Sequence, residues 1–300
     1  MVSTVPQNDP ASSAPGFWAK PEWGDIVVAL DGTQESRGAL IWAAGLASIT
    51  GSRIRLVHAL ISRHSPALGN QESIRSRVQV QGRRLLRSAR SELFGIDPGI
   101  VVDSILTDDP IASALGALSH TADLVVIGGR ASGPIRDIVF GRNATRIVTA
   151  STCPVLVWRA QPRDAAPNSP VVVGVDRSES CTRAIDAAFW YADALDVPLT
   201  ALHVRSPHER PAPDESAPEQ MRTLHWLGGR VAAAASAHPA VVVHLHVLEA
   251  SAEHELRLAS ASAHLLVVGS RGHGPWAAPI LGSIGRSLVH ASGGPILVVR

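Results

Sequence analysis

Lysine is nearly absent from this chain of 300 residues. Lys20 is the only lysine, and arginine takes its place everywhere else. A Walker A loop needs a lysine after its glycine to reach the phosphates, and Schiff-base catalysis needs a lysine amine. Lys20 lies in an N-terminal stretch, residues 1–22, that is rich in serine, proline and alanine and is expected to be a disordered tail. The sequence therefore excludes P-loop NTPases and Schiff-base enzymes.

Cysteine is also scarce, because Cys153 and Cys181 are the only two and no Cys-x-x-Cys pair exists. A zinc site built on thiolates is therefore not expected. Two isolated cysteines are typical of a protein in a reducing compartment. We expect both thiols to be reduced and buried.

Long hydrophobic runs and a strong net charge are missing as well. No apolar run approaches the ~18 residues of a membrane span, and residues 1–22 lack the apolar segment of a secretory signal. The formal net charge is +1, which gives no reason to expect nucleic acid or an anionic membrane as a partner. We expect a cytoplasmic protein that binds neither.

The common catalytic motifs do not occur. The chain has no Gly-x-Ser-x-Gly elbow, no His-Glu-x-x-His pair and no kinase motif set. The sequence therefore predicts a protein that is not an enzyme. Slow ATP turnover stays open, because bound phosphates and a metal ion already supply part of the chemistry.

The sequence repeats itself. The segments at 26–33, 124–130 and 153–158 match those at 171–178, 265–271 and 294–299. We therefore expect two copies of one domain, at residues 23–159 and 170–300. Residues 160–169, rich in proline and alanine, would be the linker between them.

Each copy alternates apolar strands with helical patterns. In the first copy we expect strands at 25–30, 53–60, 100–106, 124–127 and 155–158, and helices at 36–50, 70–93, 110–119 and 143–149. Asp108 or Asp109 would cap the third helix. Continuous apolar strands between helices indicate an α/β fold in which a doubly wound parallel sheet carries helices on both faces.

The second copy contains a glycine-rich loop between a strand and a helix. Gly269 ends the apolar run 265–268, Gly272 and Gly274 follow, and Gly282-Ser283 precedes the next helical pattern. Glycines let backbone N–H groups approach an anion, and the first turn of a helix has unsatisfied N–H donors. Ser283 would both cap this helix and bind phosphate. Asp176 ends the first strand of the copy and would face the same crevice.

These segments resemble the universal stress protein family. The resemblance rests on the G-x2-G-x9-G-S spacing from Gly269 to Ser283, and on the sequences Val-Val-Gly-Val-Asp-x-Ser at 172–178, Leu-His-Val at 202–204 and Gly-Pro-Ile-Leu-Val-Val at 294–299. It covers nearly the whole chain from residue 24, as a tandem pair. It implies two five-stranded sheets of order 3-2-1-4-5 and a regulatory protein of the stress response.

The resemblance also implies an ATP site, with or without magnesium, in the second copy. Asp176 and the backbone around Val204 would hold adenine and ribose, and the glycine loop would hold the phosphates. The expected site residues are Val175, Asp176, Val204, Gly269, Arg271, Gly272, His273, Gly282, Ser283 and Ile284. Many members dimerise, so the resemblance further implies a dimer and a protein partner that the sequence does not name.

The first copy departs from the motif. Ala131 stands where the second copy has Gly272, and Gly141-Arg142 stand where it has Gly282-Ser283. Alanine would cost about 1–2 kcal/mol in a left-handed conformation, whereas Arg142 adds a cation that fits phosphate. The remaining expected residues of this degenerate site are Asp31, Gly32 and Gly128.

The helix at 70–93 is rich in arginine. Its arginine face is either a solvated surface or a docking surface for an acidic partner. Three functions follow from the sequence as hypotheses: an ATP-binding regulator, a weak ATP hydrolase that uses Asp176, and an interaction protein that binds no nucleotide.

Overall fold

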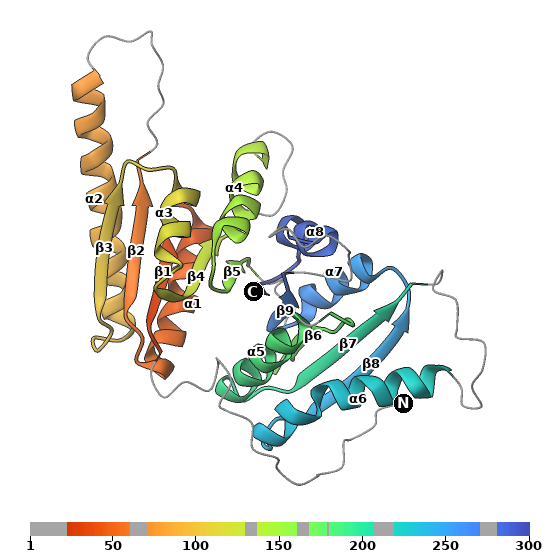
Figure 1. Cartoon of the computed structure of the whole chain (residues 1–300). Coiled ribbons are helices and arrows are strands. Elements are labelled where there is room, and N and C mark those ends of the chain that lie inside the picture. Colours follow the sequence, from red (N-terminus) through yellow and green to blue (C-terminus); the bar gives the residue numbers. More distant parts are fainter. Residues whose placement is uncertain are drawn as a thin grey trace. The chain divides into compact units, whose positions relative to one another are not determined.

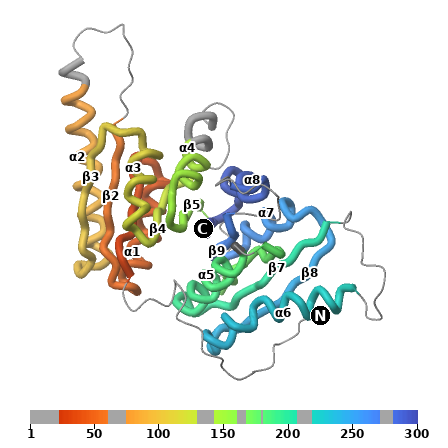
Figure 2. Tube along the Cα trace, viewed as in Figure 1, coloured from red at the N-terminus to blue at the C-terminus, as the bar shows by residue number. Residues whose placement is uncertain are grey.

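The structure, a computed structural model, describes residues 23–60, 71–129, 137–160, 168–178, 180–206, 219–270 and 281–300 (Figure 1). The chain divides into an N-terminal unit, Glu22–Arg159, and a C-terminal unit that contains Ala160–Arg300. Each unit has its own sheet and its own helices, and Figure 2 follows the chain through them by colour. Arg271, Gly272, His273 and Ala131 of the expected sites lie outside the described residues.

The N-terminal unit is built on five parallel strands in the order β3-β2-β1-β4-β5. Its strands are β1 (Asp25–Ala29), β2 (Ile54–Ala59), β3 (Val102–Thr107), β4 (Ala122–Gly128) and β5 (Val155–Trp158). Its helices are α1 (Gln34–Thr50), α2 (Gln71–Ile96), α3 (Ile111–Leu118) and α4 (Asp137–Ala150).

The C-terminal unit repeats this topology in the order β8-β7-β6-β9-β10. Its strands are β6 (Val171–Gly174), β7 (Leu199–Arg205), β8 (Val243–Glu249), β9 (Leu265–Gly269) and β10 (Ile296–Val299). Its helices are α5 (Ser180–Ala194), α6 (Glu219–Ala237), α7 (Ala252–Ser262) and α8 (Ser283–Ala291). The predicted fold, two tandem doubly wound sheets of order 3-2-1-4-5, is confirmed.

Helices cover both faces of each sheet. In the N-terminal unit α1 packs beside α2 and α3 beside α4, and in the C-terminal unit α5 packs beside α6 and α7 beside α8. The central strands are therefore shielded on both sides, and most of the side chains of β1, β4, β6 and β9 are buried. This arrangement explains why these strands read as continuous apolar runs rather than as alternating ones.

Several helix ends differ from the sequence-based expectation. α3 starts after Pro110, which makes no side-chain cap, so the predicted cap from Asp108 or Asp109 is wrong. α4 starts at Asp137 rather than at Asn143. α8 has Gly282 in the N-cap position and Ser283 as its first helical residue, so the predicted capping role of Ser283 is also wrong.

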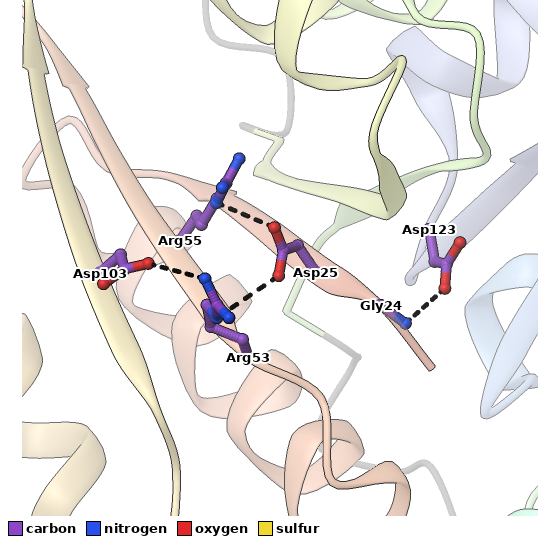
Figure 3. A network of polar contacts seen from close by, with 6 residues as sticks. All are labelled: Gly24, Asp25, Arg53, Arg55, Asp103 and Asp123. Carbon is purple, nitrogen blue, oxygen red and sulfur yellow. Dashed lines mark hydrogen bonds and ion pairs between the residues drawn. The ribbon is translucent and has the colours of Figure 1, made fainter. Parts of the chain in front are cut away.

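A polar network joins the amino ends of the strands in the N-terminal unit (Figure 3). Asp25 accepts from Arg55 at 2.9 Å and lies 3.7 Å from Arg53, whose Nη1 is 3.3 Å from Asp103 on β3. The backbone N–H of Gly24 donates to Asp123 at 2.6 Å. The network ties β1 to its neighbours at the end of the sheet opposite to the carboxyl ends of the strands, where ligands of such folds bind.

Candidate functional site

Asp176 follows β6 at the carboxyl end of the sheet, and its side chain closes a tight turn. Its Oδ1 accepts the backbone N–H of Ser178 at 2.9 Å and the hydroxyl of Ser178 at 2.5 Å. Its Oδ2 accepts no hydrogen bond within the part of the chain that the structure describes. The turn thus holds a half-buried carboxylate with one oxygen available for a donor such as a ribose hydroxyl.

The N-terminal unit forms the same turn. Asp31 Oδ1 accepts the backbone N–H of Thr33 at 3.0 Å and its hydroxyl at 2.6 Å. Gly32, between them, has φ +81°, which suits glycine. Thr33 also accepts the backbone N–H of Ser36 at 3.2 Å and so caps α1.

A histidine braces the residue before each of these aspartates. His203 Nδ1 lies 2.7 Å from the carbonyl of Val175, and His58 Nδ1 lies 2.7 Å from the carbonyl of Leu30. Because a carbonyl only accepts, Nδ1 carries the proton in both rings. The ring at the end of the second strand therefore fixes the backbone from which Asp176 or Asp31 extends. The sequence placed these histidines near the pocket, but it did not reveal the bond.

In the C-terminal unit an aromatic stack continues from this histidine. The ring of Trp226, on α6, meets His203 edge-on with 4.8 Å between ring centroids. The guanidinium of Arg177, the residue after Asp176, lies 4.8 Å from the Trp226 centroid. Sequence reasoning missed both residues, because α6 and the β6 turn meet only in the folded chain. The stack forms a wall at the carboxyl ends of β6 and β7.

A second arginine fastens the turn after Asp176 to the start of α5. Arg230 Nη2 donates to the carbonyl of Ser178 at 3.1 Å and to the hydroxyl of Thr182 at 3.3 Å. Cys181 lies in the same first turn, where burial raises the pKa of its thiol more than the nearby Arg230 lowers it. The thiol is thus held protonated and unreactive. Cys181 and Cys153 are both buried and neither forms a disulfide, so the prediction of two buried thiols is confirmed.

The glycine loop of the C-terminal unit is closed at its base by Ser270 and Gly282. Ser270 donates its backbone N–H to Val299 at 2.7 Å and accepts the N–H of Gly282 at 3.2 Å. The Ser270 hydroxyl is buried, and none of the described residues hydrogen-bonds to it. Gly282 then begins α8 without a side-chain cap. An uncapped helix start and an unsatisfied hydroxyl therefore lie next to each other.

Helix N-termini attract anions, because their first N–H groups lack intrahelical partners and the helix dipole is positive there. Ser283 and Ile284 form the first turn of α8 and are exposed. Gly269 lies at the end of β9, next to Ser270. The described residues of the loop thus offer donors to a phosphate, and Ser270 is a donor that the motif alone did not single out.

The corresponding part of the N-terminal unit is filled differently. A side chain at Gly128 would come within 2.5 Å of the backbone of Ser36, so glycine is needed here for α1 to pack against β4. The guanidinium of Arg159 lies against Gly129 and is buried, and this burial lowers its pKa while Glu35 raises it. Val157 and the buried Arg159 therefore border Gly129, which stands where the second copy has Ser270.

Gly141 and Arg142 do not begin a helix. Because α4 starts at Asp137, their backbone N–H groups fall inside the helix, where they bond to carbonyls four residues earlier. The alignment with Gly282-Ser283 at a helix start is therefore not reproduced in the structure. These N–H groups cannot serve a phosphate as those of an N-terminal turn do.

Comparison with known proteins decides the family. The family model described as "Universal stress protein family" matches residues 22–159 and again residues 167–300. The chain belongs to the universal stress protein family. Two curated universal stress proteins match this universal stress protein along most of its length. One, from Mycolicibacterium smegmatis, is 29% identical and covers 93% of this chain and 97% of its own. The other, Rv2005c from Mycobacterium tuberculosis, is 30% identical and covers 92% of this chain and 96% of its own.

A solved structure shows the same fold. The universal stress protein from Archaeoglobus fulgidus DSM 4304 superposes with a TM-score of 0.67 at 17% identity, over 92% of this chain and 98% of that one. Over the described ranges, no helix of this universal stress protein combines the length and the apolar character that a membrane crossing requires. Those ranges also contain no group of three or more His, Cys, Asp or Glu side chains placed to hold a metal ion.

Proposed function

We propose that this tandem universal stress protein binds ATP in its C-terminal unit and acts as a regulator in the stress response rather than as an enzyme. The observation that carries the proposal is the uncapped start of α8 beside the unsatisfied hydroxyl of Ser270. A buried hydroxyl without a partner costs about 1–3 kcal/mol, and a bound phosphate would remove that cost.

The phosphates would lie over the first turn of α8, held by backbone N–H groups and the hydroxyls of Ser270 and Ser283. Gly269, Arg271, Gly272, His273, Gly282 and Ile284 would complete this cradle. The nucleoside would extend toward β6 and β7, where Asp176 Oδ2 accepts a ribose hydroxyl. Adenine would lie against Val175, Val204 and the wall formed by Trp226. If magnesium accompanies ATP, Asp176 is the nearby carboxylate that could bind it.

The N-terminal unit would bind nucleotide weakly or not at all. Its aspartate turn and histidine brace are intact, but Gly129 stands where the second copy has Ser270, and Gly141 and Arg142 do not begin a helix. The aspartate turn at Asp31 and Gly32, which this unit keeps, suits a nucleoside better than a triphosphate. We further propose that the protein is cytoplasmic and that it dimerises. Analytical ultracentrifugation would test the dimer.

The decisive experiment compares two buried serines at opposite ends of α8. Ser292 ends the helix, and it too has a buried hydroxyl with no hydrogen bond among the described residues. Isothermal titration with ATP should show binding weakened by about 10- to 150-fold for Ser270→Ala, since one hydrogen bond to a charged group contributes about 1.5–3 kcal/mol. Ser292→Ala should bind like the unmodified protein. Equal affinity of all three proteins, or no binding to any, would overturn the proposal.

Weak ATP hydrolysis is a second candidate, favoured only by the available Oδ2 of Asp176. It requires phosphate release that rises in proportion to the protein added and is lost in Asp176→Ala. Release no greater than that of a buffer blank would exclude it.

A further inference from the structure

Helix α2 carries an arginine face on the side away from the core. At 3.6 residues per turn, eight exposed side chains of residues 77–94 fall within an arc of about 140°; one is Ser91, and the other seven are arginines or apolar residues. We call this the arginine face; it consists of Arg77, Val80, Arg83, Arg84, Arg87, Arg90 and Phe94, all of them exposed. The buried Gly82, Leu86, Ala89 and Leu93 lie on the opposite side of the helix.

Among the described residues, the ion pairs of α2 lie outside the arginine face. Arg75, which lies outside the arc, pairs with Asp108 at 2.8 Å. Glu92, also outside it, pairs with Arg37 of the neighbouring α1 at 2.7 Å. The five arginines of the face have no ion pair with any carboxylate in the described parts of the chain. Between residues 77 and 94 no acidic residue falls within the arc.

The fold does not require these charges. Arg83, Arg84, Arg87 and Arg90 are spaced three and four residues apart, a spacing at which like charges destabilise a helix. Helix α6 occupies the same position in the C-terminal unit, where its charged residues are Glu219, Arg222 and Arg230. The same architecture therefore forms without an arginine face, and in α2 the face opposes helix stability.

Two apolar side chains lie on the centre line of the face, with Arg87 between them. Val80 is 50% exposed and Phe94 is 38% exposed, and together with Arg87 they repeat every seven residues. Arg90 lies over the Phe94 ring at 5.3 Å. Apolar side chains in heptad register with charges on both sides are a pattern by which one helix recognises another. A nucleic-acid backbone has no apolar groups to cover Val80 and Phe94, whereas an amphipathic helix has.

From these observations we infer that the arginine face docks an acidic amphipathic helix of a partner protein. The partner would place apolar side chains at seven-residue intervals against Val80 and Phe94, and carboxylates against the flanking arginines. The contact would extend over about 26 Å, because residues 77–94 rise about 1.5 Å each. This inference is independent of nucleotide binding.

The probe is a fluorescein-labelled, alanine-based peptide of about 20 residues, which is long enough to cover the face. It carries a leucine every seven residues, and glutamates flank each leucine. Fluorescence anisotropy with the full chain should show binding that weakens as salt is raised, since exposed ion pairs are screened. A variant with Arg83→Gln, Arg84→Gln, Arg87→Gln and Arg90→Gln should bind about tenfold or more weakly. Arg75→Gln, the matched control on the same helix, should change binding by less than about twofold.

Two further measurements make the outcome decisive. The four-arginine variant should melt no lower than the unmodified protein, because it loses like-charge repulsion. If it melts lower and loses its far-UV circular dichroism signal, the variant is misfolded and the charge swap replaces it as the test. In that swap, Arg84→Glu with Arg87→Glu should bind a probe whose glutamates are replaced by lysine. Equal binding of a scrambled probe, tighter binding of a single-stranded oligonucleotide, or unchanged binding by the variants would each overturn the inference.

Discussion

At the scale of single residues, Trp158 shows how closely this fold packs. Its ring lies on the backbone of α1 at Gly38, where an added methyl group would come within 2.1 Å of the indole. Gly38→Ala should therefore lower the free energy of unfolding by about 1–3 kcal/mol, the usual cost of overpacking. Urea denaturation measures the change.

Gly45 provides the matched control for that substitution. It lies on the same helix, and an added methyl group there would have no heavy atom within 4 Å. Gly45→Ala should raise the free energy of unfolding by about 0.5–1 kcal/mol, because alanine is the better helix former. Equal effects of the two substitutions would show that contact with Trp158 is not what constrains Gly38.

His264 makes the stability of the C-terminal unit depend on pH. Desolvation lowers its pKa below the ordinary value of 6.5. The unfolded chain therefore binds more protons than the folded one between the folded-state pKa and 6.5, and stability falls as the pH falls through that range. His264→Gln should remove this part of the dependence. The measurement is melting temperature against pH for both proteins; parallel curves would contradict the prediction.

At the scale of elements, helix caps contribute unequally. Thr33 caps α1 through its hydroxyl, whereas Ser251, in the same position on α7, makes no side-chain cap bond. Thr33→Ala should cost about 1 kcal/mol, and Ser251→Ala should cost little. Chemical denaturation of the two variants compares them, and similar losses would mean that cap geometry does not determine these helix ends.

The sequence predicted elements well where one physical signal dominates. Apolar runs such as residues 124–127 must be strands of a buried parallel sheet, because both of their faces are covered. Helix ends were less predictable, since Gly282 and not Ser283 occupies the N-cap position of α8, and it supplies no side-chain cap. The start of α4 at Asp137 was missed because residues 137–142 include a glycine, which weakens a helical pattern.

The candidate site was predictable only in part. Asp176 was expected at a strand end, and the structure places it there with one oxygen available. The histidine braces, Arg177 over Trp226 and the buried Ser270 depend on contacts between residues far apart in the chain. No local periodicity encodes such contacts, so the sequence could not indicate them. The nucleotide itself stays a prediction.

At the scale of the whole molecule, the two units should respond differently to ATP. A ligand stabilises only the state that binds it, by about 2.7 kcal/mol at a free concentration of 100 times Kd. Hydrogen exchange of the most protected amides in β6 and β9 should therefore slow by about 100-fold with ATP, while amides in β1 and β4 exchange as before. Equal slowing in both units would contradict a single functional site.

The position of Tyr191 has a practical consequence for such work. It is the only tyrosine in the chain, lies on α5 in the C-terminal unit and is 1% exposed. Burial raises the pKa of its phenol far above the ordinary value, so the phenol stays protonated in alkali for as long as this unit is folded. Tyrosinate absorbance is therefore an intrinsic optical reporter for one half of the molecule, which needs no dye and no added label.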